Sequence, residues 1–253
     1  MRRSTIGLIG FIATLALPNE ASANTRRLPT EFTNRPLALP GMVLRLDAGH
    51  RWPFYDAWFK HVSVRGASDL QFLNPGVSLG VTDGFELGLV TPVRVGPELR
   101  GEDPRFHFLY QFVDGRVEVG AFGYLRFGVF DHFTTLFGVP VAIHFSPRIR
   151  LDTGGFVQID YGAAANVNFI APAQLPIQIT RRFYAGPETG LIFYNAFDDG
   201  SGVALPLGAF AGYTVGAANA PLGDLYTRFR INDLAEGFAV VELMFGAELF
   251  FDL

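Results

Sequence analysis

Apolar and polar residues alternate with a period of two along most of this 253-residue chain. The last stretch shows the pattern best, because an apolar residue at every second position is separated by Glu242, Gly246, Glu248 and Asp252. Successive side chains of a β-strand point to opposite faces, whereas a helix repeats every 3.6 residues. The chain is therefore predicted to be all-β, with strands that have one apolar and one polar face.

The composition agrees with a strand-rich fold. The chain has 29 Gly and 16 Pro, which supply turns, and 26 Phe, 8 Tyr and 2 Trp, which favour strands. With 49% hydrophobic and 17% charged residues it is too apolar for a disordered polymer. The net charge is −4 and Lys60 is the single lysine, so no nucleic acid is expected as a partner. The absence of cysteine excludes disulfides and thiolate metal sites.

Breaks in the alternation divide the chain into about twelve candidate strands, and counts of roughly ten to fourteen are compatible with the pattern. The candidate strands cover residues 42–49, 70–82, 85–94, 106–113, 117–127, 138–145, 149–161, 166–180, 183–194, 203–215, 225–231 and 238–253. Asp83-Gly84 and Asp114-Gly115 are typical of tight hairpins, and short links alternate with longer ones. This asymmetry indicates a closed antiparallel up-and-down transmembrane β-barrel with its short turns and both chain ends on the periplasmic side.

The charged residues of the candidate strands all fall on the parity opposite the apolar row. A barrel in lipid requires this pattern, because its outer face is apolar and its inner face is polar. The predicted lumen-lining residues are Arg45, Asp47, Glu86, Arg94, Glu118, Arg126, Arg150, Asp152, Asp160, Glu188, Arg228, Arg230, Glu242 and Glu248, with Asp252 at the end of the last strand.

The first residues have the features of an export signal. Arg2 and Arg3 precede an apolar stretch from Ile6 to Leu17, and small residues lead to a cleavage position after Ala23. Residues 1–23 are therefore predicted to be a cleaved signal peptide. Residues 24–40 contain three prolines and no periodicity, and we expect an extended leader before a barrel domain formed by residues 41–253.

Together, the export signal, the alternating strands, the Asp-Gly turns and the amphipathic final strand resemble bacterial outer-membrane β-barrel proteins of the porin-like, transport type. The resemblance covers residues 41–253 and implies a location in the outer membrane of a Gram-negative-type envelope. It also implies outer-membrane lipid and the barrel-assembly machinery as partners, since such a terminal strand resembles the signal that this machinery recognises. The chain departs from that signal in ending on Leu253 rather than on an aromatic residue.

Aromatic residues gather just beyond the first candidate strand. Trp52, Tyr55 and Trp58 are expected at the membrane interface, where amphipathic rings are favoured. The alternative is an ordinary loop that packs on itself.

The histidines and acidic residues do not predict an enzyme, a metal site or a cofactor. His144 and Ser146 lie two apart on the inward parity, and a His-x-Ser pair occurs in an outer-membrane lipid A deacylase family. Ser146 borders a turn on the predicted periplasmic side, however, whereas those enzymes act near the outer leaflet. We therefore expect His144 to be a polar residue of the lumen, and no catalytic or metal-binding residue is assigned.

Three functions are compatible with the sequence. Inward charges of both signs could line a passive pore for a small-molecule solute, or could pair across the lumen and leave a plugged structural or docking barrel. Inward aromatic residues would narrow either lumen; they are Phe122, Phe156, Phe210, Phe238 and Phe250. The third alternative is a secreted soluble β-sandwich, which would bury the apolar rows in a core. The pattern slightly favours the passive pore.

Overall fold

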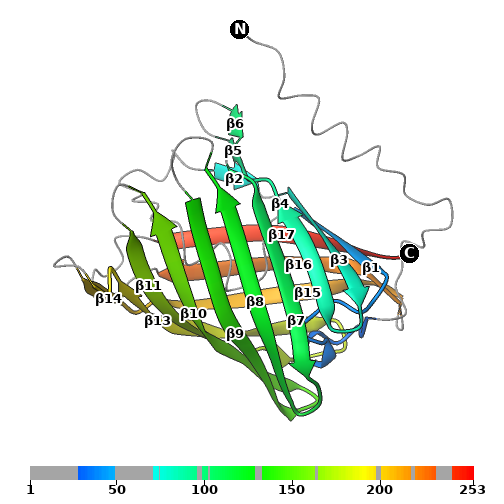
Figure 1. Ribbon diagram of the computed structural model, residues 1–253. Coiled ribbons are helices and arrows are strands. Elements are labelled where there is room, and N and C mark those ends of the chain that lie inside the picture. Colours follow the sequence, from blue (N-terminus) through cyan, green and yellow to red (C-terminus); the bar gives the residue numbers. More distant parts are fainter. Residues whose placement is uncertain are drawn as a thin grey trace, which may run out of the picture.

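Twelve antiparallel strands close into a barrel in the computed structural model of the chain (Figure 1). The structure describes residues 28–48, 71–73, 75–95, 99–101, 103–128, 133–162, 165–197, 201–217, 220–231 and 241–253. Strands that are neighbours in the sequence are neighbours in the wall, and the last strand pairs with the first, with Leu44 opposite Phe251. The predicted all-β, closed up-and-down barrel is therefore confirmed.

The wall strands are 6 to 14 residues long. In chain order they are β1 (Val43–Ala48), β3 (Pro75–Thr82), β4 (Phe85–Val90), β7 (Arg105–Val113), β8 (Val117–Phe127), β9 (Phe133–Ser146), β10 (Ile149–Tyr161), β11 (Asn166–Gln174) with its continuation β12 (Ile177–Gln178), β13 (Phe183–Tyr194), β15 (Leu207–Ala217), β16 (Ala220–Ile231) and β17 (Val241–Asp252). The short strand β14 (Gly202–Ala204) pairs with β13.

A separate three-stranded sheet stands apart from the wall. It consists of β2 (Gln71–Leu73), β5 (Val93–Val95) and β6 (Leu99–Gly101). The sequence predicted that 70–82 and 85–94 would each be one strand, and this was wrong for the ends that form β2 and β5. Pro92 separates β4 from β5 because it cannot donate a hydrogen bond to a sheet ladder.

Two wall strands begin earlier than predicted. β9 begins at Phe133 rather than near 138, and β16 begins at Ala220 rather than near 225. Pro221 is accommodated in β16 because the register shifts opposite Val215 and Gly216, and Gly216 has a φ of +123°. The longer β16 therefore includes Asp224 in the wall.

The short turns lie together at one end of the barrel, where the chain also enters β1 and leaves β17. Gly84 and Gly115 have φ values of +95° and +124°, as the two predicted Asp-Gly hairpins require. The strand ends that the longer connections join lie at the opposite end. We refer to these as the short-turn end and the long-loop end.

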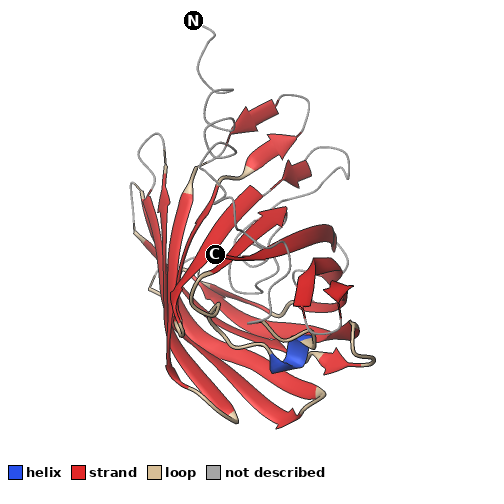
Figure 2. Ribbon diagram, turned by 90° about the vertical axis from the view of Figure 1, so that its right-hand side faces the viewer, coloured by secondary structure: helices blue, strands red, loops and turns tan. Residues whose placement is uncertain are grey.

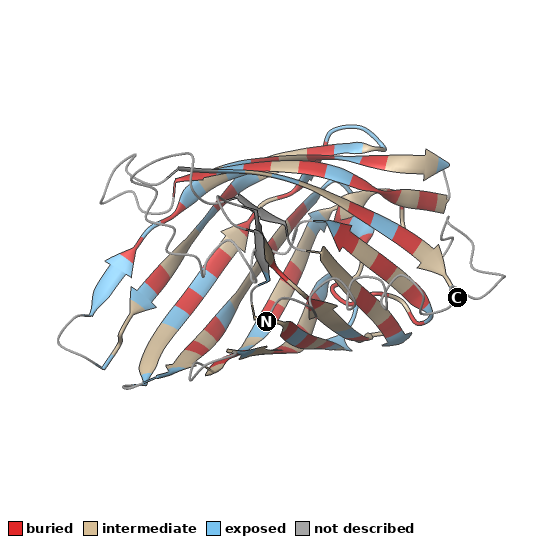
Figure 3. Cartoon of the chain, turned by 90° about the horizontal axis from the view of Figure 1, so that it is seen from above, coloured by how far each residue is buried: buried red, intermediate tan, exposed pale blue. Residues whose placement is uncertain are grey.

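Buried and more exposed residues alternate along the strands (Figure 3), and the exposed row is apolar whereas the buried row carries the charges. On β17, Phe245 is 73% exposed whereas Glu248 is 3% exposed. On β9, Phe137 and Val139 are about half exposed, whereas Ala142 is fully buried. Two stacked sheets would bury the apolar rows, so the β-sandwich alternative is excluded. Among the described residues, no helix is long and apolar enough to cross a membrane.

The described residues just before β1 lie against the inner face of the barrel. Residues 28–42, called the strap below, include the 3-10 turn η1 (Phe32–Asn34), which Figure 2 shows in blue within the curve of the wall. Leu37, Ala38 and Leu39 are each less than 5% exposed. The described part of the expected leader, residues 28–40, thus packs against the inner wall of the barrel.

Candidate functional site

The strap is held to the inner wall by side chains that accept hydrogen bonds from its backbone. The donors and acceptors are Leu37 N to Glu118 Oε2 (2.8 Å), Ala38 N to Gln111 Oε1 (3.2 Å), Leu39 N to Glu86 Oε2 (3.1 Å) and Gly41 N to Asp83 Oδ1 (2.8 Å). The acceptors come from β8, β7, β4 and the β3–β4 turn, so this half of the strap follows the wall around the short-turn end. Buried backbone N–H groups need such acceptors, since an unmade hydrogen bond is costly.

The other half of the strap contacts the wall from β9 to β13. Thr33 donates through its backbone N to Gln178 Oε1 (3.3 Å) and through its hydroxyl to the carbonyl of Pro147 (2.8 Å). Phe32 stacks on Tyr184 with ring centroids 4.5 Å apart, and the Arg150 guanidinium lies 4.7 Å from the centre of the Phe32 ring. The strap therefore crosses the lumen and touches most of its circumference.

Arg35 joins the strap to the far side of the barrel. Its guanidinium forms a buried ion pair with Asp224 on β16 and donates to Thr214 on β15 at 3.2 Å. Both wall residues are 1% exposed.

One cluster of charges surrounds Arg45 on β1. Arg45 pairs with Asp47 (3.1 Å) and with Glu86 (3.0 Å), and it donates to the hydroxyl of Ser78 (3.0 Å). Glu86 also contacts His107 Nε2 at 3.4 Å. His107, which the sequence placed inward and alone, is thus part of this cluster.

Further ion pairs line the wall at intervals. Arg150 pairs with Asp152 (2.7 Å) and also donates to the backbone carbonyl of Arg35 (2.6 Å). Arg228 pairs with Glu188 at 2.9 Å. Within each of these pairs, the two opposite charges offset one another.

The long-loop end of the lumen is polar and more open. Arg126 pairs with Asp103 at 3.1 Å, and the Arg126 side chain is 37% exposed. Asp160 accepts hydrogen bonds from Thr134 (2.7 Å) and from Gln158 (2.6 Å).

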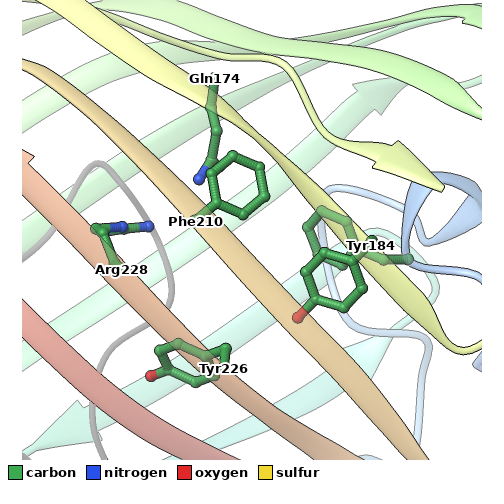
Figure 4. A pocket seen from close by; sticks show the side chains of 6 residues that line it. Gln174, Tyr184, Phe210, Tyr226 and Arg228 are labelled. Atoms are coloured by element: carbon green, nitrogen blue, oxygen red, sulfur yellow. The ribbon is translucent and has the colours of Figure 1, made fainter. Parts of the chain in front are cut away.

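Apolar side chains of the inner wall pack against the strap. Phe122 and Phe156 pack edge to face with ring centroids 6.1 Å apart, and they belong to a buried cluster with Leu37 of the strap. A small cavity beside the strap has room for about one water molecule. Figure 4 shows the side chains around it, and they are Phe32, Gln174, Tyr184, Phe210, Tyr226 and Arg228.

Two tyrosine rings lie flat on the inner wall because glycines on the next strand leave room for them. A Cβ on Gly212 would lie 2.0 Å from the Tyr184 hydroxyl, and a Cβ on Gly246 would lie 2.1 Å from Cζ of Tyr226. In the sheet register Tyr184, Gly212, Tyr226 and Gly246 follow one another across four neighbouring strands. These rings narrow the lumen on the side that faces the strap.

Most of the predicted lumen residues point inward in the structure. Those less than 6% exposed are Arg45, Asp47, Glu86, Glu118, Arg150, Asp152, Glu188, Arg228, Arg230 and Glu248. Arg126 and Asp160 lie on the same inner face but are half-buried. Glu242 lies on β17 opposite Arg230, and Asp252 is the last residue of that strand.

The remaining predicted residues lie elsewhere. Arg94 is on β5, in the separate sheet rather than in the barrel wall. Trp52, Tyr55 and Trp58 lie outside the described residues, as does Phe238. The sequence did not indicate Arg35, because the leader shows no periodicity, or Asp224, because the predicted strand began near residue 225, just after it.

His144 and Ser146 do not approach one another as a base and a nucleophile. His144 Nε2 contacts Glu118 Oε1 at 2.9 Å, and the Ser146 hydroxyl accepts a hydrogen bond from the backbone of Arg148 at 3.2 Å. Within the described part of the chain, no three His, Asp or Glu side chains gather as metal ligands.

Solved structures that are similar to this chain include two outer membrane channels. The COG4313 outer membrane channel from Pseudomonas putida F1 is 12% identical, with a TM-score of 0.49, and the match covers 85% of this chain and 96% of that one. The outer membrane channel DcaP of Acinetobacter baumannii is 10% identical, with a TM-score of 0.36, and the match covers 83% and 70%. No family model and no curated protein matches the sequence.

Proposed function

We propose that this protein is an outer-membrane channel for small solutes, which the strap closes at the short-turn end. The observation that carries the proposal is the division of the wall into an exposed apolar face and a buried charged face. A closed barrel leaves no unpaired strand edge in lipid, and its inner face is free to be polar. Outer-membrane lipid would contact the apolar rows, and the barrel-assembly machinery would recognise β17.

The way in which the lumen is filled favours a channel. Side chains alone can fill a barrel of about eight strands, whereas a wider barrel leaves space inside. Here the strap lies inside the barrel, held by hydrogen bonds to wall side chains, one buried ion pair and the packing of its apolar residues. Such a segment can leave without opening any ladder between wall strands, apart from its contact at Met42.

A structural or docking barrel is the second candidate. The observation that favours it is the buried strap inside the barrel, together with a cavity beside it that has room for about one water molecule. The two candidates differ in whether the strap is released.

Single-channel recording in planar bilayers separates them. We expect the refolded wild-type protein to give rare, small current steps. The double variant Glu86→Ala/Glu118→Ala removes two strap acceptors and should open more often and with larger steps. Asp114→Asn, in an exposed turn at the same end, serves as the control. If the double variant shows the heat-dependent gel shift of a folded barrel but gives no current steps, the structural barrel is favoured.

A further inference from the structure

The side chain of Arg35 lies in a pocket built largely by the barrel wall. Asp224 on β16 and Thr214 on β15 accept hydrogen bonds from it, and the ring of Phe250 on β17 lies 5.2 Å from the guanidinium carbon. The three wall residues are at most 2% exposed. The strap itself adds the backbone carbonyls of Pro29 (2.9 Å) and Thr30 (3.3 Å) and the ring of Phe32, whose centre lies 6.0 Å from the guanidinium carbon.

The shape of this pocket suits a guanidinium group better than an ammonium group. The two terminal nitrogens of Arg35 each donate a hydrogen bond to a different carboxylate oxygen of Asp224. A planar fork can bind a carboxylate in this two-point manner and stack on an aromatic face, whereas an ammonium is a point charge. Phe250 provides such a face.

Acidic side chains follow one another along the wall beside the pocket. In the sheet register Asp224 lies opposite Glu248, and Glu248 lies opposite Asp47, so three inward carboxylates stand in a row across β16, β17 and β1. Arg45 pairs with Asp47 at one end of this row and is shared with Glu86. Like charges on directly opposite residues are destabilising, so this part of the wall favours a second cation, which Arg35 provides.

We propose that Asp224, Thr214 and Phe250 form a binding site of the lumen for solutes that carry a guanidinium group, and that Arg35 fills this site in the closed barrel. A solute with the same group competes with Arg35 for Asp224 and thereby loosens the strap. The competition rests on the proposed channel function, whereas binding in the pocket does not.

Chemical complementation in the full-length chain tests the pocket. Arg35→Ala leaves the wall residues and the strap backbone contacts in place, and we expect a lower unfolding temperature in detergent. Added ethylguanidinium should raise that temperature, and ethylammonium should bind about tenfold more weakly because it lacks the second hydrogen bond to Asp224. Arg35→Ala/Asp224→Asn is the matched control and should show no rescue. If Arg35→Ala does not refold alone, the refolding yield with each cation gives the same comparison.

Equal effects of the two cations, rescue of the Asp224→Asn double variant, or no effect of ethylguanidinium on Arg35→Ala would each overturn the binding site. A second experiment tests the competition in the wild-type channel. L-arginine should increase the frequency of opening, whereas its neutral isostere citrulline should not. Rescue of Arg35→Ala without any conductance would support the pocket and contradict the channel, so the two failures are distinguishable.

Discussion

The backbone N–H of Leu37 donates to the carboxylate of Glu118 at 2.8 Å, although the two residues lie 81 positions apart in the sequence. Glu118 also contacts His144 through its other oxygen. One side chain of β8 therefore connects the strap with the neighbouring strand β9. Contacts of this kind hold a segment without sheet pairing in a defined place inside the barrel.

Glu118→Ala should loosen the strap. It leaves the buried N–H of Leu37 without its acceptor, which costs about 1–3 kcal/mol. We expect faster cleavage by chymotrypsin at Phe32 in the refolded protein, with the wall still intact on gels. The control variant Asp114→Asn should be cleaved at the wild-type rate. An unchanged rate for Glu118→Ala would show that the other strap contacts suffice.

Gly246→Ala should destabilise the wall, because its Cβ would lie 2.1 Å from Cζ of Tyr226. Overpacking of this kind costs about 1–3 kcal/mol, measured as a loss in the free energy of unfolding in urea. The cost should shrink in a Tyr226→Ala background, where the ring is absent. Gly155→Ala is the control, since the new Cβ would have no atom within 4 Å other than those of residue 155 and its two chain neighbours. Equal costs in both backgrounds would contradict the role of the ring.

Val139→Arg should destabilise the barrel in lipid vesicles. Val139 is 46% exposed in the middle of β9, on the outer face. A charge at mid-height in a bilayer costs about 2–4 kcal/mol, but about 0–1 kcal/mol near the interface. Val113→Arg, at the edge beside the Asp114-Gly115 turn, is therefore the matched control. Similar losses in unfolding free energy for both variants would argue against a lipid-facing band.

The wall of the barrel could be predicted from the sequence because the pattern that defines a strand lies in consecutive residues. A period of two assigns each residue to one face, and residues such as Glu188 and Leu249 are correctly placed from their parity alone. The Asp-Gly turns set the hairpins for the same reason. Errors arose where proline altered a strand, as at Pro92 and Pro221.

The strap could not be predicted, because its position depends on contacts between residues that are far apart in the sequence. Arg35 and Asp224 are separated by 189 positions, and the residues adjacent to each in the sequence do not indicate that the two side chains meet. Residues 28–40 have no periodicity, so nothing in them distinguishes a segment inside the lumen from one outside it. The pairing of inward charges into clusters likewise depends on the register between strands, which parity does not provide.

Cysteine accessibility along β10 tests the central assignment of faces most directly. The chain has no cysteine, so each introduced thiol is unique. We expect Val157→Cys and Ile159→Cys, on the outer row, to react in lipid vesicles with a lipid-soluble maleimide and to resist a charged, water-soluble one. Asp160→Cys, on the half-buried inner row near the long-loop end, should show the opposite preference. The same preference at positions 159 and 160, or the reverse of the expected order, would contradict a barrel whose apolar rows face lipid and whose charged rows face the lumen.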